Sequence, residues 1–145
     1  MAVLTDTNIF LRLLQPHHPH CPVAERALDA LRVRRETLNV TSQNLVELWA
    51  AATRPFTENG LGLTAEQAVR ELEQVKRFWT LLPEVPLHEE WERLVKMHRV
   101  SGRNTHDARL VAAMRLHGIE KILTFNMKDF ARYTTITVLD PADVG

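Results

Sequence analysis

Short apolar runs alternate along the chain with longer segments in which apolar residues recur at helical spacing. The short runs are rich in Val, Ile, Leu and Thr, which is typical of buried strands, and they lie at residues 2–5, 37–41, 121–125 and 135–139. The longer segments repeat apolar residues every three or four positions, which predicts helices at residues 8–14, 22–35, 42–54, 65–80, 88–100 and 106–117. Strands that alternate with helices predict a parallel sheet covered on both faces. We therefore expect a three-layer α/β/α sandwich with a small, mainly parallel sheet.

Proline, glycine and capping residues mark the boundaries of these elements. Three prolines within residues 15–22 predict a loop, and residues 81–86 form a break with room for a short strand. Thr64 and Gln67 have the spacing of a capping box at a helix start. Gly118 follows the last predicted helix in the position of a C-cap.

Length and composition place the chain among ordinary globular proteins. Its 145 residues suit one domain, which we expect to span residues 1–145. The formal net charge is zero, so any nucleic-acid binding requires a local basic patch. Cys21 is the single cysteine, which excludes an intrachain disulfide and fits a reducing compartment. No apolar run approaches the ~20 residues of a membrane span and no signal peptide begins the chain, so we expect a cytoplasmic protein that does not bind membranes.

Polar residues collect where the predicted strands end. Asp6 and Asn8 follow the first strand, while Thr124 and Asn126 lie at the end of the 121–125 strand, with Asp129 close behind. Ligands of open α/β sheets bind beyond the carboxyl ends of the strands. We therefore expect these side chains to share one crevice.

Two further acids are predicted to reach the same crevice. Glu47 is the one charged residue of the apolar run at 44–52, which we interpret as a largely buried helix that leaves the second strand. Asp107 lies in the first turn of the helix that precedes the 121–125 strand. Each acid also has an ordinary structural explanation: Asp6 as a helix cap, Asp107 as a partner of the helix dipole, and Glu47 as half of a buried salt bridge.

A cluster of carboxylates and amides predicts a site for a hard divalent cation. Carboxylates that lie close together repel one another and raise one another's pKa, and a cation relieves that conflict. Mg²⁺ and Mn²⁺ favour oxygen ligands, and Mg²⁺ commonly leaves room for a substrate phosphate. Hydrolysis of a phosphodiester is the reaction that such a centre suits.

At these residues the sequence resembles the PIN domain family, and within it the VapC-type toxins of bacterial toxin–antitoxin pairs. The matching segments occur in family order and cover nearly the whole chain: LTDTNIFL, TSQNLVELWAAATRP, NTHDARLVAAMRLHG and ILTFNMKDFARY. The resemblance implies a Mg²⁺- or Mn²⁺-dependent endoribonuclease, with tRNA or rRNA as the substrate. It also implies a homodimer and a cognate antitoxin that blocks the acidic site.

The resemblance assigns roles to individual residues. Asp6, Glu47 and Asp107 correspond to the catalytic acids that bind the metal, and Asn8 and Thr124 to polar neighbours that orient carboxylates or phosphate. Family members often carry a fourth acid where this chain has Asn126. Because of that departure, the fourth position is open between Asn126 and Asp129. Asp129 is therefore only a candidate for a catalytic role.

The remaining candidates are cations and a histidine-rich loop. We predict that phosphate contacts come from Arg12, Arg99 and Arg103, although a solvated helix face explains each of them as well. The segment PHHPHC at 16–21 contains soft metal ligands, but its spacing does not match usual zinc sites, and a surface loop near the crevice is the alternative. Apolar residues that suit either a dimer interface or the core are Leu61, Leu63, Val69, Leu72 and Phe78.

Two other functions compete with the nuclease prediction. A phosphatase of the haloacid dehalogenase type begins with two acids that flank one residue, whereas this chain has Asp6 and Asn8 at those places. No glycine-rich phosphate loop is present either. The second competitor is a non-catalytic binding module with a PIN-like fold, and the intact acids count against it.

Overall fold

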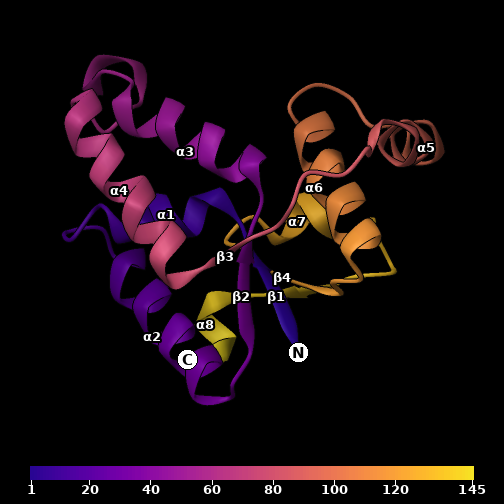
Figure 1. The fold of residues 1–145 in the computed structure, drawn as a ribbon, viewed down its shortest axis with the longest axis horizontal. Helices are drawn as coiled ribbons and strands as arrows, with labels where there is room; N and C mark the ends of the chain where they lie inside the picture. Colours follow the sequence, from indigo (N-terminus) through magenta and orange to yellow (C-terminus); the bar gives the residue numbers. More distant parts are fainter.

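A five-stranded parallel sheet forms the centre of the computed structural model, which describes residues 1–145, and helices cover both of its faces (Figure 1). Each strand pairs in parallel with its neighbours in the order β3-β2-β1-β4-β5. The strands are β1 Ala2–Thr5, β2 Thr37–Val40, β3 Thr80–Leu81, β4 Lys121–Leu123 and β5 Thr137–Leu139. The predicted three-layer α/β/α architecture is confirmed.

The helices divide between the two faces of the sheet. Helices α1 to α4 and α8 pack on one face, whereas α5, α6 and α7 pack on the other (Figure 1). Their bounds are α1 Thr7–Leu13, α2 His20–Val33, α3 Ser42–Thr53, α4 Ala65–Phe78, α5 His88–His98, α6 Asn104–His117, α7 Met127–Phe130 and α8 Pro141–Val144. A single 3₁₀ turn, η1 (Phe56–Glu58), follows α3. None of these helices combines the length and the apolar character needed to span a membrane.

Strands β1 and β4 each supply side chains to two separate cores. Val3 of β1 and Leu123 of β4 face the core beneath α1 to α4, whereas Leu4 and Ile122 face the core beneath α5 to α7. Successive side chains of a strand point to opposite faces, so this division follows from the strand geometry. Burial on both faces leaves the carboxyl ends of the strands as the open edge for a site.

Local capping explains where several helices begin and end. Thr41 and Asn44 form a capping box that starts α3 directly after β2. Thr64 and Gln67 form the capping box that their spacing predicts for α4. Gly118 ends α6 in the left-handed conformation with φ 68°, as expected for a C-cap glycine.

Several predicted boundaries differ from the structure. Helix α2 begins at His20, inside the segment predicted to be a loop, because Pro22 lies in the first helical turn, where its missing N–H is not needed. Helix α4 ends at Phe78 because Thr80 and Leu81 pair with β2 as a short strand. Strands β4 and β5 are each two residues shorter than predicted, and α8 had no predicted counterpart.

The prediction that α3 is largely buried is wrong. Its buried residues are Asn44, Leu48 and Ala52, which recur every four positions and form one face. Val46 on another face is 69 % exposed. Glu47 is therefore half-buried, at the boundary between the buried and the exposed face of α3, and does not lie inside the core.

Candidate active site

Asp6 lies at the carboxyl end of the central strand and is fixed by three hydrogen bonds. It is the N-cap of α1, where its Oδ1 accepts a bond of 2.8 Å from the backbone N–H of Thr7. Its Oδ2 accepts bonds from the Thr124 hydroxyl at 2.7 Å and from Asn8 Nδ2 at 3.3 Å. The side chain is held in one orientation and is only 6 % exposed. Asp6 thus caps a helix and also faces the open edge of the sheet.

Thr124 connects the ends of β1 and β4. While its hydroxyl donates to Asp6, it accepts bonds from Asn8 Nδ2 at 3.1 Å and from the backbone N–H of Asn126 at 3.0 Å. Asn8 Oδ1 in turn accepts a bond of 3.2 Å from the backbone N–H of Phe125. The predicted supporting residues Asn8, Thr124 and Asn126 are therefore brought together around Asp6.

Glu47 is positioned by a threonine that the sequence analysis did not select. The Thr7 hydroxyl donates to Glu47 Oε1 at 2.9 Å and accepts a bond of 3.1 Å from Asn44 Nδ2. Asn44 is fully buried and also belongs to the capping box of α3. These bonds join the start of α3 to the start of α1. Glu47 thus lies close enough to Asp6 for their charges to interact, and it forms no salt bridge to an arginine.

Gln43 joins α3 to α6, the helix that carries Asp107. Its Nε2 donates to Glu47 Oε2 at 3.3 Å and to the backbone carbonyl of His106 at 2.8 Å. Its Oε1 accepts a bond of 3.0 Å from Arg109. Because His106 directly precedes Asp107, this one amide fixes the separation of two of the predicted acids.

The electrostatics confirm that the acids lie close together. The pKa of Asp6 is raised to about 6, chiefly by burial and also by the charges of Glu47 and Asp129, while the hydrogen bonds from Thr124 and Thr7 act in the lowering direction. Burial likewise raises the pKa of Asp107 to about 7, with additional contributions from Asp6, Asp129 and Glu47. Burial and the repulsion between neighbouring carboxylates therefore both oppose ionisation of Asp6 and Asp107.

Three of the predicted acids line one polar cleft of about 720 Å³. Asp6, Glu47 and Asp107 share it with Asn8, Arg12 and Asn126. Asp129 does not line the cleft, although its charge acts on Asp6 and Asp107.

Of the three predicted phosphate contacts, only Arg12 lies in the cleft. Arg103 precedes α6, where its charge lowers the pKa of Asp107, and Arg99 ends α5 with a left-handed backbone.

The cleft also contains residues that sequence reasoning missed. Arg54 and Phe56 line it from the end of α3 and from η1. The spacing of Glu47, Ala51 and Arg54 places them on one helical face, and that periodicity was a usable signal for Arg54. No signal was available for Phe56, because its position depends on how the loop folds back on α3.

The donor set fits a hard divalent cation, because the side chains around Asp6 present carboxylate, amide and hydroxyl oxygens. No group of three or more His, Cys, Asp or Glu side chains is arranged to hold one ion by itself. Two side chains of the histidine-rich segment make packing and hydrogen-bond contacts within the protein. His20 stacks on Phe125 at 4.4 Å between ring centroids, and the Cys21 thiol donates to Glu25 at 3.2 Å.

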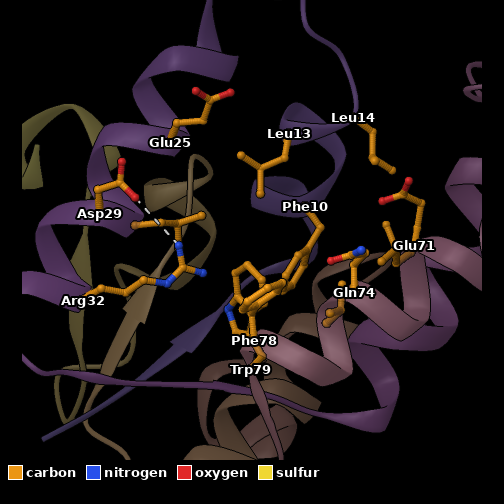
Figure 2. Close-up of a pocket in the computed structure, with 13 residues that line it drawn as sticks. Phe10, Leu13, Leu14, Glu25, Asp29, Arg32, Glu71, Gln74, Phe78 and Trp79 are labelled. Carbon is orange, nitrogen blue, oxygen red and sulfur yellow. Dashed lines mark ion pairs between the residues drawn. The ribbon is translucent and has the colours of Figure 1, made fainter.

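A second cavity, which we call the apolar groove, lies between α1, α2 and α4 and measures about 450 Å³ (Figure 2). Its lining comes mainly from apolar side chains of these helices, with Leu48 of α3: Phe10, Leu13, Leu14, Leu28, Leu48, Val75, Phe78 and Trp79. Acidic side chains surround it, namely Glu25, Asp29 and Glu71 (Figure 2). Arg32 pairs with Asp29 at 3.8 Å and lies 5.1 Å from the centre of the Trp79 ring.

Comparison with known proteins finds similarity in sequence and in fold. The chain is 29% identical over 140 residues to "Ribonuclease VapC24" of Mycobacterium tuberculosis, covering 94% of each chain. Its fold resembles that of VapBC2 from Rickettsia felis bound to a promoter DNA fragment, with a TM-score of 0.70, 16% identity and coverage of 96% and 98% of the two chains. It also resembles VapC20 of Mycobacterium tuberculosis, described as a toxin that cleaves the sarcin–ricin loop, with a TM-score of 0.66, 19% identity and coverage of 90% and 95%.

The fold and the site together define a class of protein. It consists of single α/β domains in which carboxylates from separate helices meet at the carboxyl edge of a parallel sheet. The model of the PIN domain matches residues 3–135, and the chain belongs to the PIN domain family.

Proposed function

We propose that this protein is an endoribonuclease that depends on a divalent cation and acts as the toxin of a toxin–antitoxin pair. The observation that carries the proposal is the convergence of Asp6, Glu47 and Asp107 on one open polar cleft. The relative named as a ribonuclease and the related toxin described as cleaving the sarcin–ricin loop support RNA as the substrate.

Mg²⁺ or Mn²⁺ is the cofactor that this cleft suits. Asp6, Glu47 and Asp107 are the residues that we propose as its ligands. Mg²⁺ usually keeps several waters and uses one or two carboxylates, so it does not require all three acids to contact it at once. When bound, such a cation lowers the pKa of water and stabilises negative charge on a phosphate.

The protein's own contribution is positioning. Thr124 and Asn8 hold one oxygen of Asp6 while the N–H of Thr7 holds the other, so the carboxylate is oriented before substrate arrives. Thr7 and Gln43 orient Glu47 in the same way. Preorganised groups need little rearrangement during the reaction, which is the main electrostatic advantage of an enzyme site over water.

The roles of the remaining predicted site residues are proposals of the same kind. Asn126 lines the cleft and fills the fourth position directly, whereas Asp129 acts on the cluster through its charge. Arg12 contacts RNA phosphate inside the cleft, and Arg103 and Arg99 contact the strand where it leaves the cleft.

We also propose that the apolar groove receives the antitoxin. The solved relatives include toxin–antitoxin complexes, such as VapBC2 of Rickettsia felis. An apolar floor with Glu25, Asp29 and Glu71 around it fits an amphipathic segment whose apolar face is flanked by basic residues. The homodimer remains a prediction: of the residues suggested for it, Leu61 lines the cleft, Phe78 lines the groove, and Val69 is 44 % exposed.

Cleavage of total tRNA and ribosomal RNA by the purified chain tests the proposal. The assay compares Mg²⁺ or Mn²⁺ with EDTA and includes p-nitrophenyl phosphate as a phosphatase substrate. Discrete RNA fragments that require the cation support the proposal. Hydrolysis of the small phosphate ester without RNA cleavage would assign a phosphatase instead, and a folded chain that binds Mn²⁺ but cleaves neither would assign a binding module.

A further inference from the structure

The cleft changes character along its length. Asp6 is the N-cap of α1 and Glu47 lies one turn into α3, whereas Arg12 lies in the last turn of α1 and Arg54 is the C-cap of α3. Glu47 and Arg54 are seven positions apart, which corresponds to about 10 Å along the helix axis. The cations are therefore displaced from the acidic centre by a distance that suits a neighbouring nucleotide.

Both arginines are available for a ligand. Neither of them forms an ion pair with a carboxylate, although other arginines of the chain do. Arg12 donates to Gln15 at 2.8 Å through one terminal nitrogen, while its Nε is buried without a hydrogen-bond partner. Because both arginines line the cleft and neither is neutralised by a carboxylate, their guanidinium charges can bind a phosphate.

Phe56 adds an aromatic surface to this basic end of the cleft. Its side chain lines the cleft and is 78 % exposed. A Cβ at Gly62 would lie 2.7 Å from Cε2 and 2.9 Å from Cδ2 of Phe56, so the loop backbone packs closely against this side of the ring. The ring is thus held by the loop while most of its surface stays exposed.

The loop that carries Phe56 is anchored to α3. The backbone N–H groups of Leu61, Gly62 and Leu63 donate to carbonyls near the end of that helix at 3.1, 2.9 and 2.9 Å. A Cβ at Gly60 would lie 1.8 Å from the Arg54 carbonyl oxygen, so the close return of the loop requires glycine there. A large exposed aromatic side chain on an anchored loop costs little entropy to order, which favours its use as a binding surface.

We propose that Phe56, Arg54 and Arg12 form a nucleotide subsite, in which a base of single-stranded RNA stacks on Phe56 and its phosphate binds the two arginines. Aromatic stacking beside a positively charged groove is the general mode by which proteins bind unpaired nucleic acid. This inference rests on the proposed ribonuclease function and deepens it, because it selects an unpaired substrate and a fixed offset between the stacked base and the acidic centre.

The test measures binding of a short fluorescein-labelled oligoadenylate to the full chain in an Asp6→Asn background, which prevents cleavage. Phe56→Ala is expected to weaken binding about tenfold, and Phe56→Trp is expected to restore it. Arg54→Gln and Arg12→Gln are each expected to weaken binding and to reduce the salt slope by about 1, whereas Phe56→Ala leaves the slope unchanged. Val33→Ala is the matched control, because Val33 is 83 % exposed and lies outside the cleft.

Two further measurements distinguish stacking from a structural effect. Replacing one adenosine at a time by an abasic nucleotide is expected to weaken binding at one position, and Phe56→Ala should abolish that position dependence. RNA is also expected to quench the fluorescence that Phe56→Trp adds.

The outcomes separate this proposal from the one on which it rests. RNA binding that is unchanged in Phe56→Ala, or an added Trp that is not quenched, would overturn the subsite while the nuclease proposal stands. Failure of the unmodified chain to cleave total RNA, together with absence of oligoadenylate binding, would overturn both.

Discussion

Helices α1 and α3 each contribute to two cavities of opposite character. Their faces toward the cleft carry Asn8, Arg12 and Glu47, while their faces toward the apolar groove carry Phe10 and Leu48. The side chains of the cleft are held in place by hydrogen bonds between the ends of different helices and strands. The groove is instead formed by apolar side chains that pack against one another. Neighbouring residues of one helix can thus serve RNA on one side and a protein on the other.

This difference has a consequence for mutation. A polar site depends on individual atoms, so loss of one carboxylate or amide removes a specific function. An apolar groove depends on area shared among many side chains, with a few large ones contributing most of the binding. The two cavities are therefore expected to be separable by single substitutions.

The largest expected effect is that of Asp6→Asn. Asparagine caps a helix as well as aspartate does, so the melting temperature should stay close to that of the parent. Cleavage of RNA should fall more than 100-fold, beyond the loss typical of residues that only support a metal ligand. Asp140→Asn is the matched control, because Asp140 also caps a helix, by accepting a bond from Ala142, but lies outside the cleft. Retained cleavage in Asp6→Asn would refute the site assignment.

Phe78→Ala tests the groove in the same comparison. Phe78 lines the groove and is 56 % exposed, so its loss should weaken binding of the antitoxin by about 10- to 100-fold. Titration calorimetry with the cognate antitoxin measures that change, and the rate of RNA cleavage should be unaffected. If cleavage falls in parallel with antitoxin binding, the two cavities are not independent.

Gln43→Ala tests whether the hydrogen bonds around the cleft position its carboxylates. Removal of this amide frees Glu47 and releases α6 at the His106 carbonyl, so Mn²⁺ affinity and kcat/KM should each fall about tenfold. Electron paramagnetic resonance of Mn²⁺ gives the affinity without reference to activity. Gln67→Ala removes a capping glutamine that does not line the cleft and should leave Mn²⁺ binding unchanged. Equal Mn²⁺ affinity in both variants would show that Gln43 has no positioning role.

The pH dependence of stability gives the smallest effect. The pKa of Asp107 is raised to about 7, chiefly by burial, whereas that of an aspartate in the unfolded chain is about 4, so between these pH values the folded chain binds more protons than the unfolded chain. Its contribution to the free energy of unfolding therefore declines as the pH rises from about 4 to about 7. Without metal, the melting temperature of Asp107→Asn minus that of the parent should increase as the pH rises through this range. Above about pH 7 this difference should stay constant.

Addition of Mn²⁺ at neutral pH should reverse the advantage of Asp107→Asn. At a concentration one hundred times its Kd, the ion is expected to raise the melting temperature of the parent by about 5–10 °C. A constant difference between the two proteins at every pH would contradict the raised pKa.

Much of the fold follows from the sequence because its strands are short apolar runs and its helices carry clear caps. Thr64, Gln67 and Gly118 mark real boundaries through local hydrogen bonds and backbone conformation. The two-residue strand β3 has no such pattern of its own, since it exists only through its pairing with β2.

The site was predictable where residues stand at strand ends, and not where they act across elements. Asp6, Asn8 and Thr124 follow from the rule that parallel sheets bind ligands at their carboxyl edge. Thr7 and Gln43 do not, because their function depends on partners 40 and 63 residues away in sequence. Glu47 is predicted as a site residue from its expected place in a buried helix, and that argument is wrong because Glu47 borders an open cleft.

The central place of β1 in the sheet has a consequence for synthesis on the ribosome. The strand made first pairs with β4, and Asp6 is fixed by Thr124, which lies 118 residues further along the chain. Contacts between such distant residues form late and slowly in folding. A nascent chain therefore lacks the hydrogen bond that orients Asp6 until Thr124 has left the ribosome, so the cleft becomes organised only after β4 has been made.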